Sequence, residues 1–327
     1  MSVARRAYDA VRLWQPPSWT GSTPRGVVVL GMHRSGTSAA TRLVNVLGPA
    51  TCAPGEMVRG PWNPSGHFES RALMHLNNAL LTQMGRTWWY PPPAGEQDYE
   101  AVAARITITR PQARRAFRRV HRTVPWVWKD PRTSVLLPYW RSVLGDRLAA
   151  VVVVRNPIEV AVSMQRRHGV PVSFGVALWE RYNRLILLHS AGLPVLVTRY
   201  DDLVDDPAAW SEGARTFLAG LGMRLDDTSG TLVAARDFVD ADLRHSTHTR
   251  ADVVDAGSTS LAVYDALEDV MGPSASFRSP PLPPEPSAVA TELDTVGPDT
   301  ELAWHPPPWA PEHDGTSQRG PKAAHEK

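Results

Sequence analysis

Short runs of apolar residues recur along the first two thirds of the chain. Three of them are continuously apolar and do not alternate with polar residues: Gly26 to Gly31, Leu148 to Val154 and Leu193 to Thr198. Continuous runs of this length are typical of strands in a parallel sheet that is covered on both faces. The pattern therefore predicts three buried strands, with Val124 to Lys129 as a fourth candidate.

Between these runs lie stretches whose apolar residues recur at the spacing of one helix face. They predict helices over Thr37 to Leu47, Glu69 to Gln83, Thr133 to Leu144, Pro157 to Arg167 and Phe174 to Ala191. Strands that alternate with helices are typical of an open α/β sheet, which binds ligands beyond the carboxyl ends of its strands. We therefore expect a three-layer α/β fold around a central parallel sheet.

The composition of the chain changes near residue 272. Of the 30 prolines, 12 fall between Pro273 and Pro321, in a stretch without apolar periodicity. Such a stretch buries too little apolar surface to offset its ordering entropy, so we predict a proline-rich disordered tail over 273–327. Residues 1–25 are predicted as a helical lead-in, and 26–272 are long enough for one well-buried domain.

Arginine carries almost all of the positive charge. Only three of the 35 basic residues are lysines, and two of these, Lys322 and Lys327, lie in the predicted tail. The remaining one, Lys129, either serves a task that needs a compact ammonium group or reflects a composition that favours arginine. The net charge of +2 provides no large cationic field, which argues against nucleic acid as a partner.

The N-terminal segment has no apolar core of a secretory signal. The longest apolar run, Leu148 to Val154, is too short to cross a bilayer, so we expect a cytoplasmic protein without an integral membrane segment. Cys52 is the only cysteine, which excludes a disulfide framework and a multi-cysteine zinc site. We expect no bound metal.

The stretch GMHRSGTS lies between the first predicted strand and the first predicted helix. It nearly matches the phosphate-binding pattern G-x-x-x-x-G-K-[ST] through Gly31, Gly36 and Ser38, but Thr37 occupies the lysine position. Loop amides and a helix N-terminus hold an anion by geometry alone, and Arg34 adds a charged donor. The alternative is an ordinary strand–turn–helix connection with a threonine cap.

A second motif, VVVVRNP, ends the strand over 148–154. In phosphate-loop nucleotide hydrolases a later strand ends in an aspartate that holds magnesium, whereas this one ends in Arg155. Ser163 follows two helical turns after Asn156, so it faces the same end of the strand. Arg155 and Ser163 are therefore candidates for holding a second phosphate; alternatively, Arg155 only pairs with Glu159.

Together these motifs resemble the sulfotransferases that use 3'-phosphoadenosine 5'-phosphosulfate, in particular a bacterial branch with loops of the type GMHRSGTS and a later KDPR. The resemblance covers about Val27 to Pro207. It implies a sulfotransferase fold related to the P-loop nucleoside triphosphate hydrolases, the phosphosulfate donor as co-substrate, and Arg155 with Ser163 on its 3'-phosphate. The residues that it implies for the 5'-phosphosulfate are Gly31, His33, Arg34, Ser35, Gly36, Thr37 and Ser38.

The resemblance also implies catalytic roles for four residues. Arg34 stands where many relatives carry a lysine at the bridging oxygen, so it would stabilise charge on the leaving phosphate. Lys129 resembles a lysine near the sulfuryl group in carbohydrate-directed members. Glu69 is favoured as the general base over His67, because it follows the first loop and helix as the catalytic glutamate does in relatives. The alternative for Glu69 is a favourable charge at a helix N-terminus.

The function implied by the resemblance is transfer of a sulfuryl group to a hydroxyl of a saccharide or a secondary metabolite, a small-molecule or glycan acceptor. Two alternatives stay open. A small-molecule kinase using ATP would need a loop lysine and a metal-binding aspartate where Thr37 and Arg155 stand. A non-catalytic anion-binding or interaction protein would use the proline-rich tail as its functional part.

Three further segments have weaker signals. Trp88 and Trp89 either line an acceptor pocket or belong to the core. The segment 244–250 contains His245 and His248 but no third ligand at metal spacing, so a zinc site is not expected there. Asp130 and Arg132 of the KDPR motif are expected to shape a turn.

Overall fold

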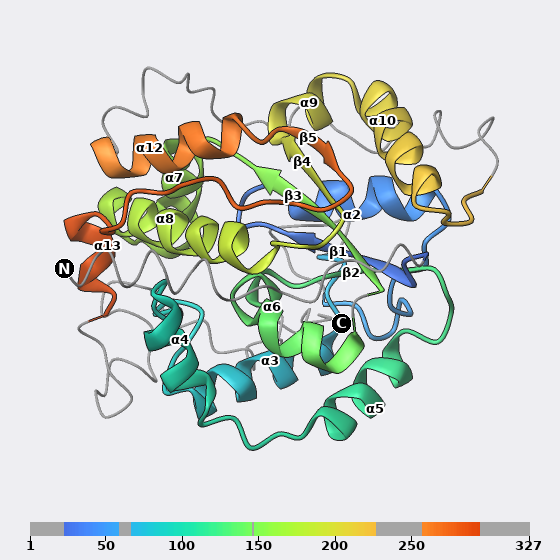
Figure 1. The fold of residues 1–327 in the computed structure, drawn as a ribbon, viewed down its shortest axis with the longest axis horizontal. Helices are drawn as coiled ribbons and strands as arrows, with labels where there is room; N and C mark the ends of the chain where they lie inside the picture. The colour runs from blue at the N-terminus through green and yellow to red at the C-terminus, as the bar shows by residue number, and fades with distance from the viewer. Residues whose placement is uncertain (1–22, 59–66, 146, 227–256, 295–327) are drawn as a thin grey trace, which may run out of the picture.

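The computed structural model describes residues 23–58, 67–145, 147–226 and 257–294 (Figure 1). Its centre is a five-stranded sheet with the strand order β2-β1-β3-β4-β5. Four strands are parallel, and β5 pairs antiparallel with β4 at one edge. The strands are β1 (Gly26–Leu30), β2 (Trp126–Lys129), β3 (Leu148–Val154), β4 (Val195–Arg199) and β5 (Gly272–Ser274).

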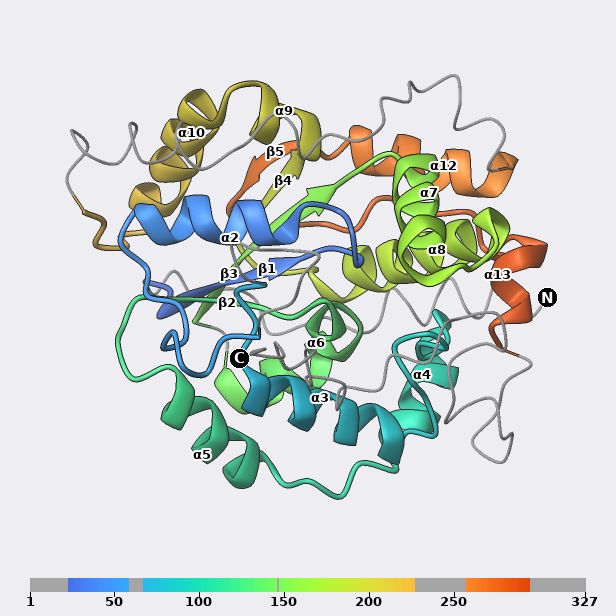
Figure 2. The same ribbon diagram turned by 180° about the vertical axis from the view of Figure 1, so that it is seen from behind.

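Helices cover both faces of the sheet, which confirms the predicted three-layer α/β architecture. Three helices pack on one face (Figures 1 and 2): α2 (Thr37–Val46), α9 (Tyr200–Asp205) and α10 (Pro207–Gly220). The other described helices contribute to the core of the opposite face: α3 (Arg71–Gln83), α4 (Glu96–Ala103), α5 (Arg110–Val120), α6 (Pro131–Leu144), α7 (Pro157–His168), α8 (Val172–His189), α12 (Ser258–Glu268) and α13 (Ala288–Glu292).

Strand β3 shows why the strands are continuously apolar. Ala149, Val151 and Val153 pack in the core beneath α2, and the residues between them pack in the core on the opposite face. Because side chains alternate between the faces of a sheet, both sets must be apolar when both faces are covered. All residues of β3 are accordingly buried.

Helix α3 begins two residues later than its apolar pattern predicts. Ser70 is its N-cap, and the serine hydroxyl accepts a hydrogen bond from the amide of Leu73 at 3.3 Å. This cap satisfies one of the free amides at the helix N-terminus. Glu69 therefore lies just outside the helix, in the segment that leads to it.

Residues 273–294 are ordered, so the prediction that disorder begins at residue 273 was wrong. The segment packs along α8, whose charged residues bind it (Figure 1). The guanidinium group of Arg181 is fully buried and donates to both carboxylate oxygens of Asp294 at 2.7 Å. The carboxylate of Glu180 accepts from the amide of Ser287 at 3.0 Å. An extended proline-rich segment needs such partners from another element, and α8 supplies them.

Three predicted features lie outside the described residues: most of the lead-in 1–25, the segment 244–250, and the tail after residue 294. None of the helices in the described ranges combines the length and the apolar character that a membrane span requires.

Candidate active site

The four parallel strands bring the predicted motifs to one edge of the sheet. The phosphate-loop-like segment follows β1, Lys129 is the last residue of β2, Arg155 follows β3, and Tyr200 follows β4. Strand register aligns these ends, since Lys129 is level with Val29 of β1. This edge is where open α/β sheets bind ligands.

The loop between β1 and α2 requires glycine at two positions. Gly31 has φ 156° and Gly36 has φ 85°. A Cβ atom at Gly36 would lie 2.2 Å from Cδ2 of Tyr200, and one at Gly31 would lie 2.7 Å from Cγ2 of Thr37. Arg34 also has a positive φ, 71°, which is uncommon for residues other than glycine. The loop is thus a tightly constrained turn.

Not every loop residue offers its backbone to a ligand. The amide of Gly31 donates to Oγ of Ser134 at 3.0 Å, and the amide of Ser35 donates to the carbonyl of Met32 at 3.2 Å. The N-terminus of α2 has no side-chain cap, so the first amides of the helix, at Thr37 and onward, lack that partner. The anion-binding capacity of the loop therefore lies at its α2 end.

Arg155 takes part in the loop structure as well as in an ion pair. Its Nε donates to Glu159 at 2.7 Å, which is one of the predicted alternatives. Its Nη1 donates to the carbonyl of Arg34 at 3.0 Å, and its guanidinium carbon lies 4.2 Å from the centre of the Tyr200 ring. The pair with Glu159 therefore does not remove Arg155 from the loop. Nε of Arg34 in turn donates to Oγ of Ser163 at 2.9 Å.

Lys129 connects the other predicted catalytic residues. Its Nζ donates to Oε1 of Glu69 at 2.5 Å, to Oγ of Ser38 at 3.3 Å and to the carbonyl of His67 at 3.3 Å. Ser38 also donates to that carbonyl at 3.3 Å. The ammonium group and the Glu69 carboxylate are both buried. The structure thus brings these residues together at the N-terminus of α2, with the backbone of His67 as the contact.

Asp130 and Arg132 hold the turn that follows Lys129. Asp130 is the N-cap of α6, and its Oδ1 accepts from the amide of Arg132 at 3.0 Å and from Nη1 of Arg132 at 3.1 Å. Its other carboxylate oxygen accepts from Nδ2 of Asn77 at 2.9 Å. Arg132 also reaches Glu69, with 3.9 Å between Nη1 and Oε2. The turn therefore supports the position of Glu69.

Cationic side chains dominate the electrostatics of this edge. Burial and the positive charges of neighbouring guanidinium groups lower the pKa of Arg34 to about 10. Burial, Lys129 and two arginines lower the pKa of His67 to about 3, and burial with nearby cations lowers the pKa of His33 well below its ordinary value. Both imidazoles are therefore neutral at neutral pH. A positive potential of this kind favours an anionic ligand.

Two tryptophans lie beside the loop. Trp88 is half-buried; its ring centre lies 4.4 Å from that of His33 and 3.7 Å from that of Trp89. Trp89 is buried and meets His168 edge to face at 5.0 Å. Trp89 is therefore a core residue, whereas Trp88 joins that core to the phosphate-loop-like segment.

The sequence patterns did not indicate Tyr200 or Arg167 as members of the site. Arg167 lowers the pKa values of both Arg34 and His67 through its positive charge, which places its side chain near them. Its position four residues after Ser163 on α7 was a usable signal, because residues at that spacing share a helix face. Tyr200 had no comparable signal, since its role depends on contact with Gly36.

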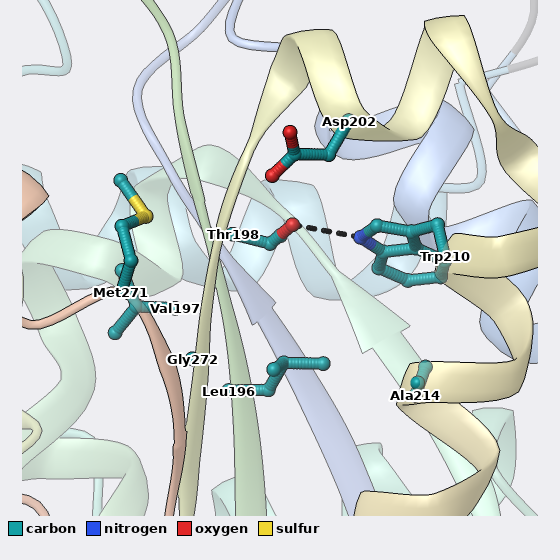
Figure 3. Close-up of a pocket in the computed structure, with 9 residues that line it drawn as sticks. Leu196, Val197, Thr198, Asp202, Trp210, Ala214, Met271 and Gly272 are labelled. Carbon is teal, nitrogen blue, oxygen red and sulfur yellow. Dashed lines mark hydrogen bonds between the residues drawn. The ribbon is translucent and has the colours of Figure 1, made fainter.

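A separate cavity of about 250 Å³ lies between β4, β5 and α10 (Figure 3). Leu196 and Met271 line it, and Nε1 of Trp210 donates to Oγ1 of Thr198 at its wall at 2.8 Å. None of the predicted site residues lines this cavity. Within the described ranges, no group of three or more His, Cys, Asp or Glu residues is arranged to hold a metal ion. The expected absence of a metal stays a prediction.

The fold and the site define an α/β protein with a cation-rich strand–loop–helix site at the carboxyl edge of its sheet. The chain matches no family model and no curated protein. It is similar to three solved structures. These are a sulfotransferase domain from the Synechococcus PCC 7002 olefin synthase (19% identity, 86% of this chain, 97% of that chain, TM-score 0.41), a sulfotransferase domain from the curacin biosynthetic pathway (16%, 84%, 97%, 0.43) and the Mycobacterium tuberculosis H37Rv sulfotransferase STF1 (17%, 82%, 83%, 0.41). At these identities and TM-scores the likeness is distant, so function follows from the site itself.

Proposed function

We propose that the protein is a sulfotransferase that moves a sulfuryl group from 3'-phosphoadenosine 5'-phosphosulfate to a hydroxyl of a saccharide or secondary-metabolite acceptor. One observation carries the proposal: Arg34, Lys129 and Arg155 gather around an uncapped helix N-terminus behind a constrained glycine loop. A helix N-terminus with added cations binds phosphate-like groups. The donor is the most highly charged part of such a reaction.

The two ends of the donor would bind to different parts of the site. The α2 end of the loop, with Thr37 and Ser38, would bind the 5'-phosphosulfate. Arg155 and Ser163 would bind the 3'-phosphate. The contact between Arg34 and Ser163, at 2.9 Å, supports this arrangement because it connects the two parts.

Glu69 is the proposed general base. Its carboxylate would accept the proton of the acceptor hydroxyl as the oxygen forms a bond to sulfur. The bond from sulfur to the bridging oxygen breaks, and adenosine 3',5'-bisphosphate leaves. His67 is less suited to this task, because burial and nearby cations lower its pKa to about 3 and so disfavour proton uptake.

Lys129 and Arg34 would stabilise the charge that develops during transfer. Lys129 already contacts both Glu69 and the Ser38 hydroxyl, so it joins the proposed base to the proposed phosphosulfate site. Electrostatic stabilisation by fixed cations is commonly the largest contribution to such reactions. Trp88, beside the loop, is a candidate for the wall of the acceptor pocket.

A calorimetric titration tests this proposal. We expect the protein to bind adenosine 3',5'-bisphosphate, and Arg155→Ala to weaken that binding by about 10- to 100-fold through loss of a charge-assisted hydrogen bond. Binding of ATP with magnesium, and none of the bisphosphate, would indicate the kinase alternative. Binding of neither nucleotide would favour the non-catalytic alternative.

A further inference from the structure

The cations near the loop differ in whether a carboxylate neutralises them. Three of them have such partners: Lys129 with Glu69, Arg132 with Asp130 and Arg155 with Glu159. Arg34 and Arg167 form no ion pair with any residue of the described ranges. Two partly buried guanidinium groups without a carboxylate are unfavourable neighbours in the absence of an anion.

Ser163 links these two arginines. Its Oγ accepts a hydrogen bond from Nε of Arg34 at 2.9 Å. Arg167 lies four residues further along α7, on the same helix face. Nε of Arg167 is buried and has no hydrogen-bond partner among the described residues. Arg34 and Arg167 therefore approach one region from two elements, the loop and α7.

The electrostatic effects agree with this geometry. After burial, the positive charge of Arg167 is the largest cause of the lowered pKa of Arg34. Burial likewise lowers the pKa of Arg167, and only the Glu69 carboxylate opposes it. The two arginines thus repel each other in the ligand-free protein, and an anion between them would remove that repulsion.

We propose that Arg34 and Arg167 form a two-guanidinium clamp that binds one tetrahedral oxyanion, a phosphoryl or sulfuryl group of the ligand. The Ser163 hydroxyl accepts from Arg34 and keeps its own hydrogen, so it is the third donor of the clamp. Guanidinium groups suit this task because their forked donors match the oxygens of such groups. The inference rests on the proposed function only for the identity of the ligand.

Binding measurements on Arg167→Met test the clamp, with Arg166→Met as the matched control. Arg166 is exposed and adjacent in α7, so its substitution removes the same charge from the same helix. The probes are adenosine 3'-monophosphate and adenosine 5'-monophosphate. We expect Arg167→Met to weaken at least one of them by about 10- to 100-fold, and the control to change neither. The nucleotide that is lost identifies the clamped group; equal loss of neither would overturn the proposal.

Thermal denaturation gives an independent readout. Without ligand, Arg167→Met should raise the melting temperature because it relieves repulsion, and inorganic phosphate should then stabilise the variant less than the wild type. A lower melting temperature for Arg167→Met without ligand would mean that Arg167 has a structural partner, and would overturn the clamp.

The outcomes separate the clamp from the proposed function. If the wild type binds inorganic phosphate through Arg167 but does not bind adenosine 3',5'-bisphosphate, the clamp stands and the sulfotransferase proposal fails. If the bisphosphate binds wild type and Arg167→Met equally well, the sulfotransferase proposal stands and the clamp fails.

Discussion

Gly36→Ala adds one methyl group at the tightest point of the phosphate-loop-like segment. Gly36 has φ 85° and ψ 10°, where alanine costs about 1 to 2 kcal/mol relative to glycine. The new Cβ would also lie 2.2 Å from Cδ2 and 2.6 Å from Cε2 of Tyr200. The ring would have to move by roughly 1 Å to reach ordinary contact, and overpacking of this kind costs about 1 to 3 kcal/mol. We expect a total loss of about 2 to 5 kcal/mol in the free energy of unfolding.

Urea unfolding, followed by tryptophan fluorescence, measures this loss in two backgrounds. In Tyr200→Ala the ring is absent, so Gly36→Ala should cost only the backbone part, about 1 to 2 kcal/mol. The ring also stacks on Arg155, at 4.2 Å from its guanidinium carbon, so Gly36→Ala alone should weaken binding of adenosine 3',5'-bisphosphate. An equal loss of stability in both backgrounds would refute the contact with Tyr200.

Three further predictions concern the base, the acid sensitivity and the C-terminal segment. Glu69→Gln should lower kcat about 10²- to 10⁴-fold in a sulfuryl-transfer assay and leave titration of the bisphosphate unchanged; full activity would assign the base elsewhere. Burial lowers the pKa of His121 to about 4 from an ordinary 6.5, so its contribution to stability is complete above pH 6.5 and is lost as the pH falls toward 4. His121→Phe should therefore show a smaller drop in urea midpoint between pH 7 and pH 4.5 than the wild type, and an identical drop would contradict this. Asp294→Ala should cost about 2 to 3 kcal/mol in urea unfolding because it strands the buried Arg181, and the loss is moderated by the 35% exposure of Asp294; an unchanged midpoint would speak against the ion pair.

The parallel strands could be predicted because their residues are apolar on both faces, as in β3. The edge strand β5 could not, since it is three residues long and contains a glycine and a proline. Its pairing is determined by the exposed edge of β4. Helix α5 was missed for a different reason: only Ala113 and Phe117 are buried in it, and arginines occupy most of its other positions.

The positions of the site residues were partly predictable. Motifs at strand ends must meet at one edge of a parallel sheet, which brings Arg155 and Lys129 to the loop. The ion pair of Lys129 with Glu69 was not predictable, because it depends on how the segment before α3 crosses the start of α2. The backbone contact of Ser38 with His67 fixes that crossing, and no local sequence pattern encodes it.

The packing of residues 273–294 on α8 has a practical consequence for shortening the chain. Helix α8 holds Arg181, which binds Asp294, and also Trp179, whose Nε1 donates to the carbonyl of Arg155 at 3.0 Å. A chain cut at residue 272, where the proline-rich composition begins, would expose one side of the helix that supports Arg155. A cut after Asp294 would preserve this support, so a shortened form intended for crystallisation or ligand screening should end there.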